Sequence, residues 1–172
     1  LASIAFPAWH LGRHPNHEFI SCSYSGSLAM SFSRKVRQLL REPLYKNIFD
    51  KTRLDKDSQS VESWNTTNGG GNVSAGVGGG ITGKGANVLL IDDPVKNRED
   101  AESDHNRDLI WDWYTSTAYT RLSPGGGVLV ILTRWHDDDL AGRLLRFAEE
   151  GADQWEVVKY PAIAEEDEDY RA

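Results

Sequence analysis

Asn87-Val88-Leu89-Leu90-Ile91-Asp92-Asp93-Pro94 is the stretch of the sequence that decides the fold. Its four consecutive large apolar residues are too few for a helix. They suit a strand that is buried on both faces, as in a parallel sheet covered by helices. Pro94 ends such a strand because it has no N–H to donate to a neighbouring strand. The pattern therefore places Asp92 and Asp93 at the carboxyl end of a central strand, where open α/β sheets bind their ligands.

Two carboxylates in this position have the form of a Walker B segment. In such a segment the first Asp holds Mg²⁺ through water, and the second orients or deprotonates the water that attacks the nucleotide. Asp92 and Asp93 are therefore candidate Mg²⁺ residues of an ATP site, with Asp93 as the catalytic carboxylate. From these residues alone, a buried strand that runs into an acidic turn is an equally good interpretation.

The length and composition exclude several classes of protein. The 172 residues are enough for one domain with a buried core. The net charge of −7 argues against a protein that coats nucleic acid non-specifically, although a local basic patch is compatible with it. The only cysteine, Cys22, excludes an internal disulfide and fits a reducing compartment. No apolar run approaches the length that crosses a membrane, and nothing at the start resembles a signal peptide.

Strand and helix patterns alternate along the chain, which predicts an α/β domain with a mainly parallel sheet flanked by helices. We expect helices over residues 1–11, 28–41, 100–122 and 137–149, and a short helical turn with a loop over 43–57. We expect strands over residues 18–23, 61–67, 72–77, 87–92, 128–132 and 155–160, the second and third forming a hairpin across a glycine-rich turn. The domain spans residues 1–164, and the acidic residues 165–172 form a linker.

The glycine-rich residues 78–85 nearly satisfy the phosphate-loop signature G-x-x-x-x-G-K-[ST]. Gly85 stands where that signature needs a hydroxyl for Mg²⁺. A phosphate loop also opens a helix, whereas here the chain runs straight into the strand at Val88. We therefore reject this loop as Walker A, and a contact of Lys84 with phosphate or a neighbouring subunit is the minority alternative. The chain starts at Leu1 in what reads as mid-helix, so we expect a fragment whose phosphate loop precedes Leu1.

A second apolar run, residues 128–132, leads into Thr133-Arg134-Trp135-His136. In P-loop ATPases with an inserted central strand, the strand beside Walker B ends in a polar residue. That residue touches the γ-phosphate or the attacking water. Thr133 is the candidate for this role, and the alternative is that it caps the following turn.

At this point the chain resembles a known family, the large terminase subunits of tailed bacteriophages. Leu90-Ile91-Asp92-Asp93-Pro94-Val95-Lys96 and the glycine-rich residues before it resemble the Walker B region of that family. Residues 132–144 are similar to its coupling motif and the helix that follows. The segments 23–37 and 111–122 resemble the family as well. The similarity covers nearly the whole chain, and its segments occur in the family's order.

The resemblance implies a P-loop ATPase fold and the motor that pumps double-stranded DNA into a procapsid with ATP. Asp92 would hold Mg²⁺, Asp93 would be catalytic, and Thr133 would couple hydrolysis to movement and contact the nucleotide. Arg134 and His136 would sense or relay the nucleotide state, Arg134 as one of the catalytic residues. Many terminases have Glu where Asp93 stands, so a shorter side chain must reach the water. Neither a Walker A lysine nor the family's C-terminal nuclease domain lies in these residues, so we expect this piece alone to hydrolyse ATP poorly and not to cut DNA.

The same resemblance implies partners and a location. These are double-stranded DNA, the portal protein, the small terminase subunit and further copies in a ring, in the host bacterial cytoplasm and away from membranes. Two alternatives stay open: another P-loop ATPase such as a helicase-like motor, or a non-catalytic remnant that only binds terminase or portal partners.

Two other residue groups suggest metal sites. His10, His14, His17 and Cys22 lack the spacing of a zinc site, and Pro15 between two of them favours a surface turn. The segment His136-Asp137-Asp138-Asp139 has the carboxylates of a nuclease-type site. Capping of the following helix by an Asp is the interpretation that we prefer.

Overall fold

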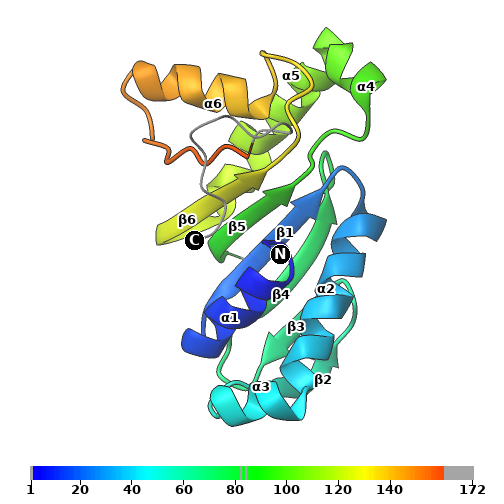
Figure 1. Ribbon diagram of the computed structural model, residues 1–172, viewed down its shortest axis with the longest axis vertical. Helices are drawn as coiled ribbons and strands as arrows, with labels where there is room; N and C mark the ends of the chain where they lie inside the picture. The colour runs from blue at the N-terminus through cyan, green and yellow to red at the C-terminus, as the bar shows by residue number, and fades with distance from the viewer. Residues whose placement is uncertain (1, 82, 84, 161–172) are drawn as a thin grey trace.

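The computed structural model describes residues 2–81, 83 and 85–160, which form a sheet flanked by helices (Figure 1). Its strands are β1 (Glu18–Ser23), β2 (Leu54–Gln59), β3 (Ser63–Thr66), β4 (Gly71–Gly76), β5 (Ala86–Asp92) and β6 (Leu122–Ile131). Its helices are α1 (Ala5–Arg13), α2 (Gly26–Arg41), α3 (Pro43–Ile48), α4 (Arg98–Glu102), α5 (Asp104–Trp113) and α6 (Leu140–Glu149). A π-helical turn, η1 (Tyr114–Ala118), and a 3₁₀ turn, η2 (Tyr119–Arg121), follow α5. The predictions for Leu1, Lys84 and the acidic residues 165–172 lie outside the described residues.

The six strands form one sheet in the order β2-β3-β4-β1-β5-β6. Strands β4, β1, β5 and β6 are parallel neighbours, and β2 and β3 extend the sheet in antiparallel fashion. The predicted hairpin is confirmed as β3 and β4. The structure therefore confirms the α/β class with a mainly parallel sheet between helices.

Strand β5 is an interior strand of the sheet, between β1 and β6, and its apolar run packs on both faces. Leu89 and Ile91 join the core under α5, η1 and α6, whereas Val88 joins the core under α1 and α2 (Figure 1). Leu90 between them is also buried. Side chains alternate between the two faces of a strand, so a strand without a polar position must be covered on both sides. That coverage extends along β5 to Ile91; Asp92 is the last residue of the strand, and Asp93 begins the turn.

Side-chain caps set the start of α2, which follows β1, and the start of α6, which follows β6. Ser25 accepts a hydrogen bond from Leu28 N at 3.3 Å, and α2 begins just after it. Asp139 accepts one from Gly142 N at 2.9 Å, and α6 begins just after it. An accepting oxygen at this position satisfies a backbone N–H that has no partner within the helix. These caps place the helix starts within three residues of the predicted ones.

The helix expected over residues 100–122 is interrupted. Ser103 has an extended backbone with ψ 114°, and its hydroxyl accepts a hydrogen bond from Asn106 N at 3.3 Å. It therefore separates α4 from α5, and η1 and η2 replace the last turns of the expected helix. Trp113 and Tyr114 near the end of this segment are buried, and the serine that starts a new helix is a local polar cap that helix periodicity does not report.

Two strand predictions differ from the structure. The segment 43–57 was predicted as a helical turn with a loop, but its last residues lie in β2. This strand lies at the edge of the sheet, and its sequence, Leu-Asp-Lys-Asp-Ser-Gln, has no alternation of apolar residues that would have revealed it. The strand expected over residues 155–160 is wrong, since these residues have no regular structure. Val157 and Val158 are 51% and 66% exposed there. Two valines favour a strand only where a neighbouring strand is available to pair with them.

Strand β6 begins earlier than the predicted strand at residue 128. Its register against β5 slips, because Ala86 pairs with Leu122 and Val88 pairs with Gly127. The residues between Leu122 and Gly127 bulge outward, and Gly125 there has φ +77°, a backbone conformation that suits glycine.

No helix in the part of the chain that the structure describes is long and apolar enough to cross a membrane.

Candidate functional site

The carboxyl ends of β1, β5 and β6 meet at one edge of the sheet. Asp92 is the last residue of β5 and lies in register with Ser23 of β1 and Ile131 of β6. Asp93 follows it directly, and Thr133 follows β6 by two residues. The predicted placement of Asp92, Asp93 and Thr133 at this edge agrees with the structure.

Asp93 has an unusual backbone that its neighbours hold in place. Its φ of 46° makes it the only non-glycine residue with positive φ among the described residues. Asp93 N donates to Ile131 O at 2.8 Å, and Asp93 O accepts from Tyr24 N at 2.9 Å. Asp tolerates the left-handed region better than most residues, and strained conformations cluster at functional sites. The turn therefore fixes an exposed carboxylate between the ends of β1 and β6.

Asp92 is half-buried, and one side chain holds its carboxylate. Ser3, two residues before α1, donates a hydrogen bond from Oγ to Asp92 Oδ2. Burial raises the pKa of Asp92 above its ordinary value; the Ser3 hydroxyl opposes this shift, and the charge of Asp93 adds to it. A carboxylate that is costly to keep ionised in a protein favours a bound cation. The environment of Asp92 therefore fits a metal ligand.

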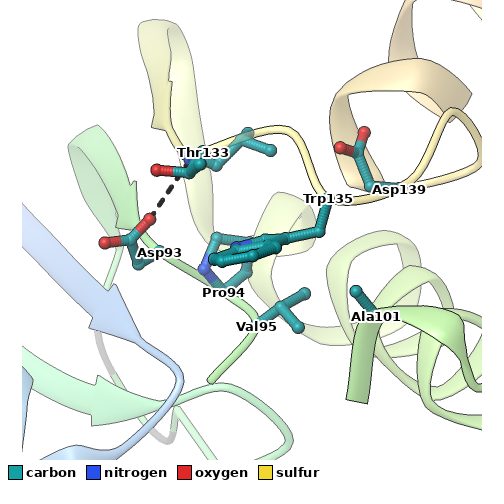
Figure 2. Close-up of a pocket in the computed structure, with 8 residues that line it drawn as sticks. Asp93, Pro94, Val95, Ala101, Thr133, Trp135 and Asp139 are labelled. Carbon is teal, nitrogen blue, oxygen red and sulfur yellow. Dashed lines mark hydrogen bonds between the residues drawn. The ribbon is translucent and has the colours of Figure 1, made fainter. Parts of the chain in front are cut away.

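Thr133 contacts Asp93 through its backbone. Thr133 N donates to Asp93 Oδ1 at 3.4 Å, and Figure 2 shows this bond across a small cavity. The cavity has a volume of about 10 Å³. Its lining residues are Asp93, Pro94, Val95, Ala101, Leu132, Thr133, Trp135 and Asp139. A space of this size holds about one water molecule, so the site has room for a water beside the Asp93 carboxylate.

The described residues leave both carboxylates free of cations. Within residues 2–81, 83 and 85–160, no Arg or Lys forms an ion pair with Asp92 or Asp93. Carboxylate oxygens are the ligands that Mg²⁺ prefers, and this ion usually keeps several waters and takes one or two carboxylates. The donor set at the end of β5 therefore fits Mg²⁺.

Arg134 and His136 take part in local contacts away from the two carboxylates. Arg134 Nε donates to Asp139 Oδ2 at 2.6 Å, which ties the guanidinium to the start of α6. His136 Nδ1 accepts from Asp138 N at 2.9 Å. The structure therefore does not bring these two side chains to Asp93, and their catalytic and sensing roles stay predictions.

The acidic segment before α6 has a structural role. Asp139 caps the helix and pairs with Arg134. Asp138 pairs with Arg107, Arg143 and Arg146, which joins α5 to α6. These ion pairs, Arg143 first, hold the pKa of Asp138 well below its ordinary value. The helix-capping interpretation is confirmed for Asp139.

His10, His14 and His17 lie close together, but their rings are not arranged around a common point as ligands of one metal ion would be. His10 Nε2 and His17 Nδ1 are 3.0 Å apart, and the rings of His14 and His17 stack with their centroids 4.7 Å apart. Stacked rings do not direct their lone pairs at one point. Burial, with His14 and His17 nearby, lowers the pKa of His10 to about 4. In the described part of the chain, no three His, Cys, Asp or Glu side chains form a group that fits a metal ion.

The described residues of the glycine-rich loop before β5 also argue against a phosphate loop. Ile81 is buried in the core, and Gly79 O accepts a hydrogen bond from Trp113 Nε1 at 3.0 Å. The chain then enters β5 at Ala86 and opens no helix. The loop is therefore a connection anchored to the core.

Sequence reasoning missed Ser3 and Trp135. Ser3 reaches Asp92 across 89 positions of the chain, and no local pattern reports such a contact. Trp135 is 46% exposed and lines the cavity, with its ring beside Pro94 in Figure 2. A tryptophan two residues after Thr133, in a segment of polar residues, was the available signal for the second residue.

Two comparisons with known proteins bear on this chain. The family model described as "Terminase large subunit, T4likevirus-type, N-terminal" matches residues 1–172. The solved structure of the HK97 bacteriophage large terminase is similar, with 15% sequence identity and a TM-score of 0.47. That similarity covers 80% of this chain and 27% of the HK97 chain, so this chain spans about a quarter of the length of that protein. No curated protein matches the chain.

Proposed function

The chain belongs to the terminase large subunit family of T4likevirus type, and it matches the model of that family's N-terminal region. We propose that it is part of an ATPase that drives DNA packaging. In this proposal the edge formed by β1, β5 and β6 is the half of the nucleotide site that handles Mg²⁺ and the attacking water. The phosphate loop comes from residues outside the 172 of this chain. The substrate is ATP, and the energy of hydrolysis moves double-stranded DNA.

The hydrogen bond from Thr133 N to Asp93 Oδ1 is the observation that carries the proposal. It joins the second carboxylate of the Walker B segment to the residue two positions after the neighbouring strand β6, beside a cavity of about 10 Å³. Sequence order places these residues 40 positions apart. The pairing of Asp92 with Ile131 brings them together, and the Thr133 N–H then holds the Asp93 carboxylate beside the cavity, an arrangement that supports a catalytic site.

Each residue has one task in the proposed reaction. Asp92 would hold Mg²⁺ through water, and at that place the ion would supply positive charge to offset that of the phosphates. Asp93 accepts a hydrogen bond from the attacking water and orients it, or takes its proton. The Thr133 N–H fixes the Asp93 carboxylate, and the Thr133 hydroxyl faces the γ-phosphate or that water. Loss of the γ-phosphate then changes the contacts of the loop that carries Thr133 and Trp135.

Partners and location are part of the same proposal. The portal protein, the small terminase subunit and further copies in a ring are the expected partners in the host cytoplasm. Family membership supports them. The net charge of −7 means that DNA contacts require a local basic patch.

Replacing Thr133 by Val tests the proposed site. Valine keeps the shape of threonine and the backbone N–H that bonds to Asp93, so the variant removes only the hydroxyl. We expect ATP hydrolysis by the full-length protein to fall about 10²-fold, the usual effect of losing one donor to a reacting oxygen. Steady-state hydrolysis with and without double-stranded DNA measures this effect.

Thr133→Ser is the matched control, because it keeps the hydroxyl and loses only a methyl group. We expect it to retain most of the activity. Equal hydrolysis by the Val variant and the unaltered protein would contradict the role of the hydroxyl. A full-length protein that hydrolyses no ATP under any condition would favour the non-catalytic remnant.

A further inference from the structure

The carboxylate of Asp92 points to the face of the sheet that α1 and α2 cover. Phe19 and Val88 on that face pack with α1 and α2, and positions two apart in a strand share a face, so Asp92 shares the face of Val88. The chain reaches α1 through Ser3, whose Oγ donates to Asp92 Oδ2. Ser3, two residues before α1, therefore holds the side chain of Asp92, the last residue of β5.

Ser23 offers a second hydroxyl on the same face. It is the register partner of Asp92 on the parallel strand β1, and paired residues of parallel strands point to the same side. Ser23 is fully buried, and its Oγ has no hydrogen-bond partner. Of the two hydroxyls near the end of β5, only that of Ser3 bonds to the Asp92 carboxylate.

We propose that Ser3 is a positioning residue, which fixes the orientation of the Asp92 carboxylate that the proposed function assigns to Mg²⁺. Ser3 is not the hydroxyl of a phosphate-loop signature, because Leu1-Ala2 precede it where that signature has Gly-Lys. A hydrogen bond from a hydroxyl to an ionised carboxylate is stronger than one between neutral groups. Partners of this kind orient metal-binding carboxylates, and their loss usually weakens metal binding by about 10–100-fold.

The link also couples two elements. Leu11 and Ala8 bury α1 against the sheet, so the position of Ser3 depends on the packing of that helix. A displacement of α1 relative to β5 would break the bond and release the Asp92 carboxylate. Metal affinity thereby depends on the placement of α1.

Three variants separate positioning from folding. Ser3→Ala removes the hydroxyl, Ser3→Thr restores it on a bulkier side chain, and Ser23→Ala removes the neighbouring hydroxyl that does not bond to Asp92. The first measurement is the ¹³C resonance of the Asp92 carboxyl in aspartate-labelled protein, assigned with Asp92→Asn. Ser3→Ala should shift this resonance, and the other two serine variants should leave it near its original position.

The second measurement is the dissociation constant of Mn²⁺, used as the probe for Mg²⁺. It is determined by water-proton relaxation in the full-length protein with a non-hydrolysable ATP analogue. We expect Ser3→Ala to weaken Mn²⁺ binding about tenfold or more, and Ser3→Thr and Ser23→Ala to stay within a few-fold of the unaltered protein.

The outcomes distinguish this inference from the proposed function. Weaker Mn²⁺ binding in Asp92→Asn with unchanged binding in Ser3→Ala would overturn the positioning role alone. An unmoved Asp92 resonance in Ser3→Ala would do the same. If Asp92→Asn binds Mn²⁺ as tightly as the unaltered protein, the metal role of Asp92 is wrong, and the inference fails with it.

Discussion

Asp93→Asn should lower ATP hydrolysis by the full-length protein about 10²–10⁴-fold, the range for loss of a positioned acid–base group. Asparagine has the shape of aspartate but accepts protons poorly and carries no charge. It also tolerates the left-handed backbone with φ 46° at this position. The backbone bonds to Ile131 and Tyr24 do not involve the side chain, so the turn stays in place. Nucleotide binding should change only a few-fold, because the proposed function assigns Asp93 to the attacking water.

Glu99→Gln is the matched control for this variant. Glu99 is an exposed carboxylate in the first turn of α4, and its replacement makes the same change of charge close to the site. We expect it to keep its activity. Hydrolysis in single-turnover conditions isolates the chemical step from product release. Unchanged hydrolysis by Asp93→Asn would show that another group activates the water.

Asp138→Asn should destabilise the protein at neutral pH by about 1–3 kcal/mol. The Asp138 carboxylate accepts hydrogen bonds from three arginines, among them Arg143 at 2.6 Å and the 7% exposed Arg107. Asparagine leaves these guanidinium groups without the negative charge that joins α5 to α6. The packing of Trp111 against Phe147 lies between the same two helices and should loosen as well.

The pH dependence of stability identifies the cause of this loss. The three arginines, Arg143 first, hold the pKa of Asp138 below its ordinary value, so the ionised form stabilises the folded state. This stability is fully present above the unfolded pKa of about 4 and is lost progressively as the pH falls from there through the lower pKa of the folded state. The unaltered protein should therefore approach the stability of Asp138→Asn in acid.

Urea unfolding midpoints at pH 7 and in steps down to about pH 3 measure the difference. Asp50→Asn is the control, because Asp50 is exposed and forms no ion pair within the described part of the chain. Its unfolding midpoint should match that of the unaltered protein at each pH. A stability difference between Asp138→Asn and the unaltered protein that stays constant with pH would contradict the electrostatic account.

The central strand and its carboxyl end were predictable because burial on both faces leaves a strong pattern. Leu89, Leu90 and Ile91 must all be covered, and only a parallel sheet between helices covers them. The order of Asp92, Asp93 and Thr133 along the chain then placed them at one edge. The same reasoning rejected the glycine-rich loop before β5, because a strand follows it.

The contacts that refine the site depend on tertiary packing and left no local pattern. The bond between Ser3 and Asp92 requires α1 to lie across β1, which no periodicity reports. The ion pair from Arg134 to Asp139 ties to the start of α6 a residue to which the family resemblance assigns a role at the nucleotide. Strand β2 is polar because it lies at the edge of the sheet, and residues 155–160 have valines but no neighbouring strand in the described part of the chain. Edges and long-range contacts are therefore where the sequence was least informative.

The position of a bound metal tests the central claim most directly. Anomalous scattering from Mn²⁺ in crystals of the full-length protein with a non-hydrolysable ATP analogue locates the ion without reference to activity. We predict one Mn²⁺ at the carboxyl edge of the sheet, joined to Asp92 through bound water, with Asp93 and Thr133 facing the terminal phosphate. Mn²⁺ and nucleotide bound away from Asp92 and Asp93 would contradict the account.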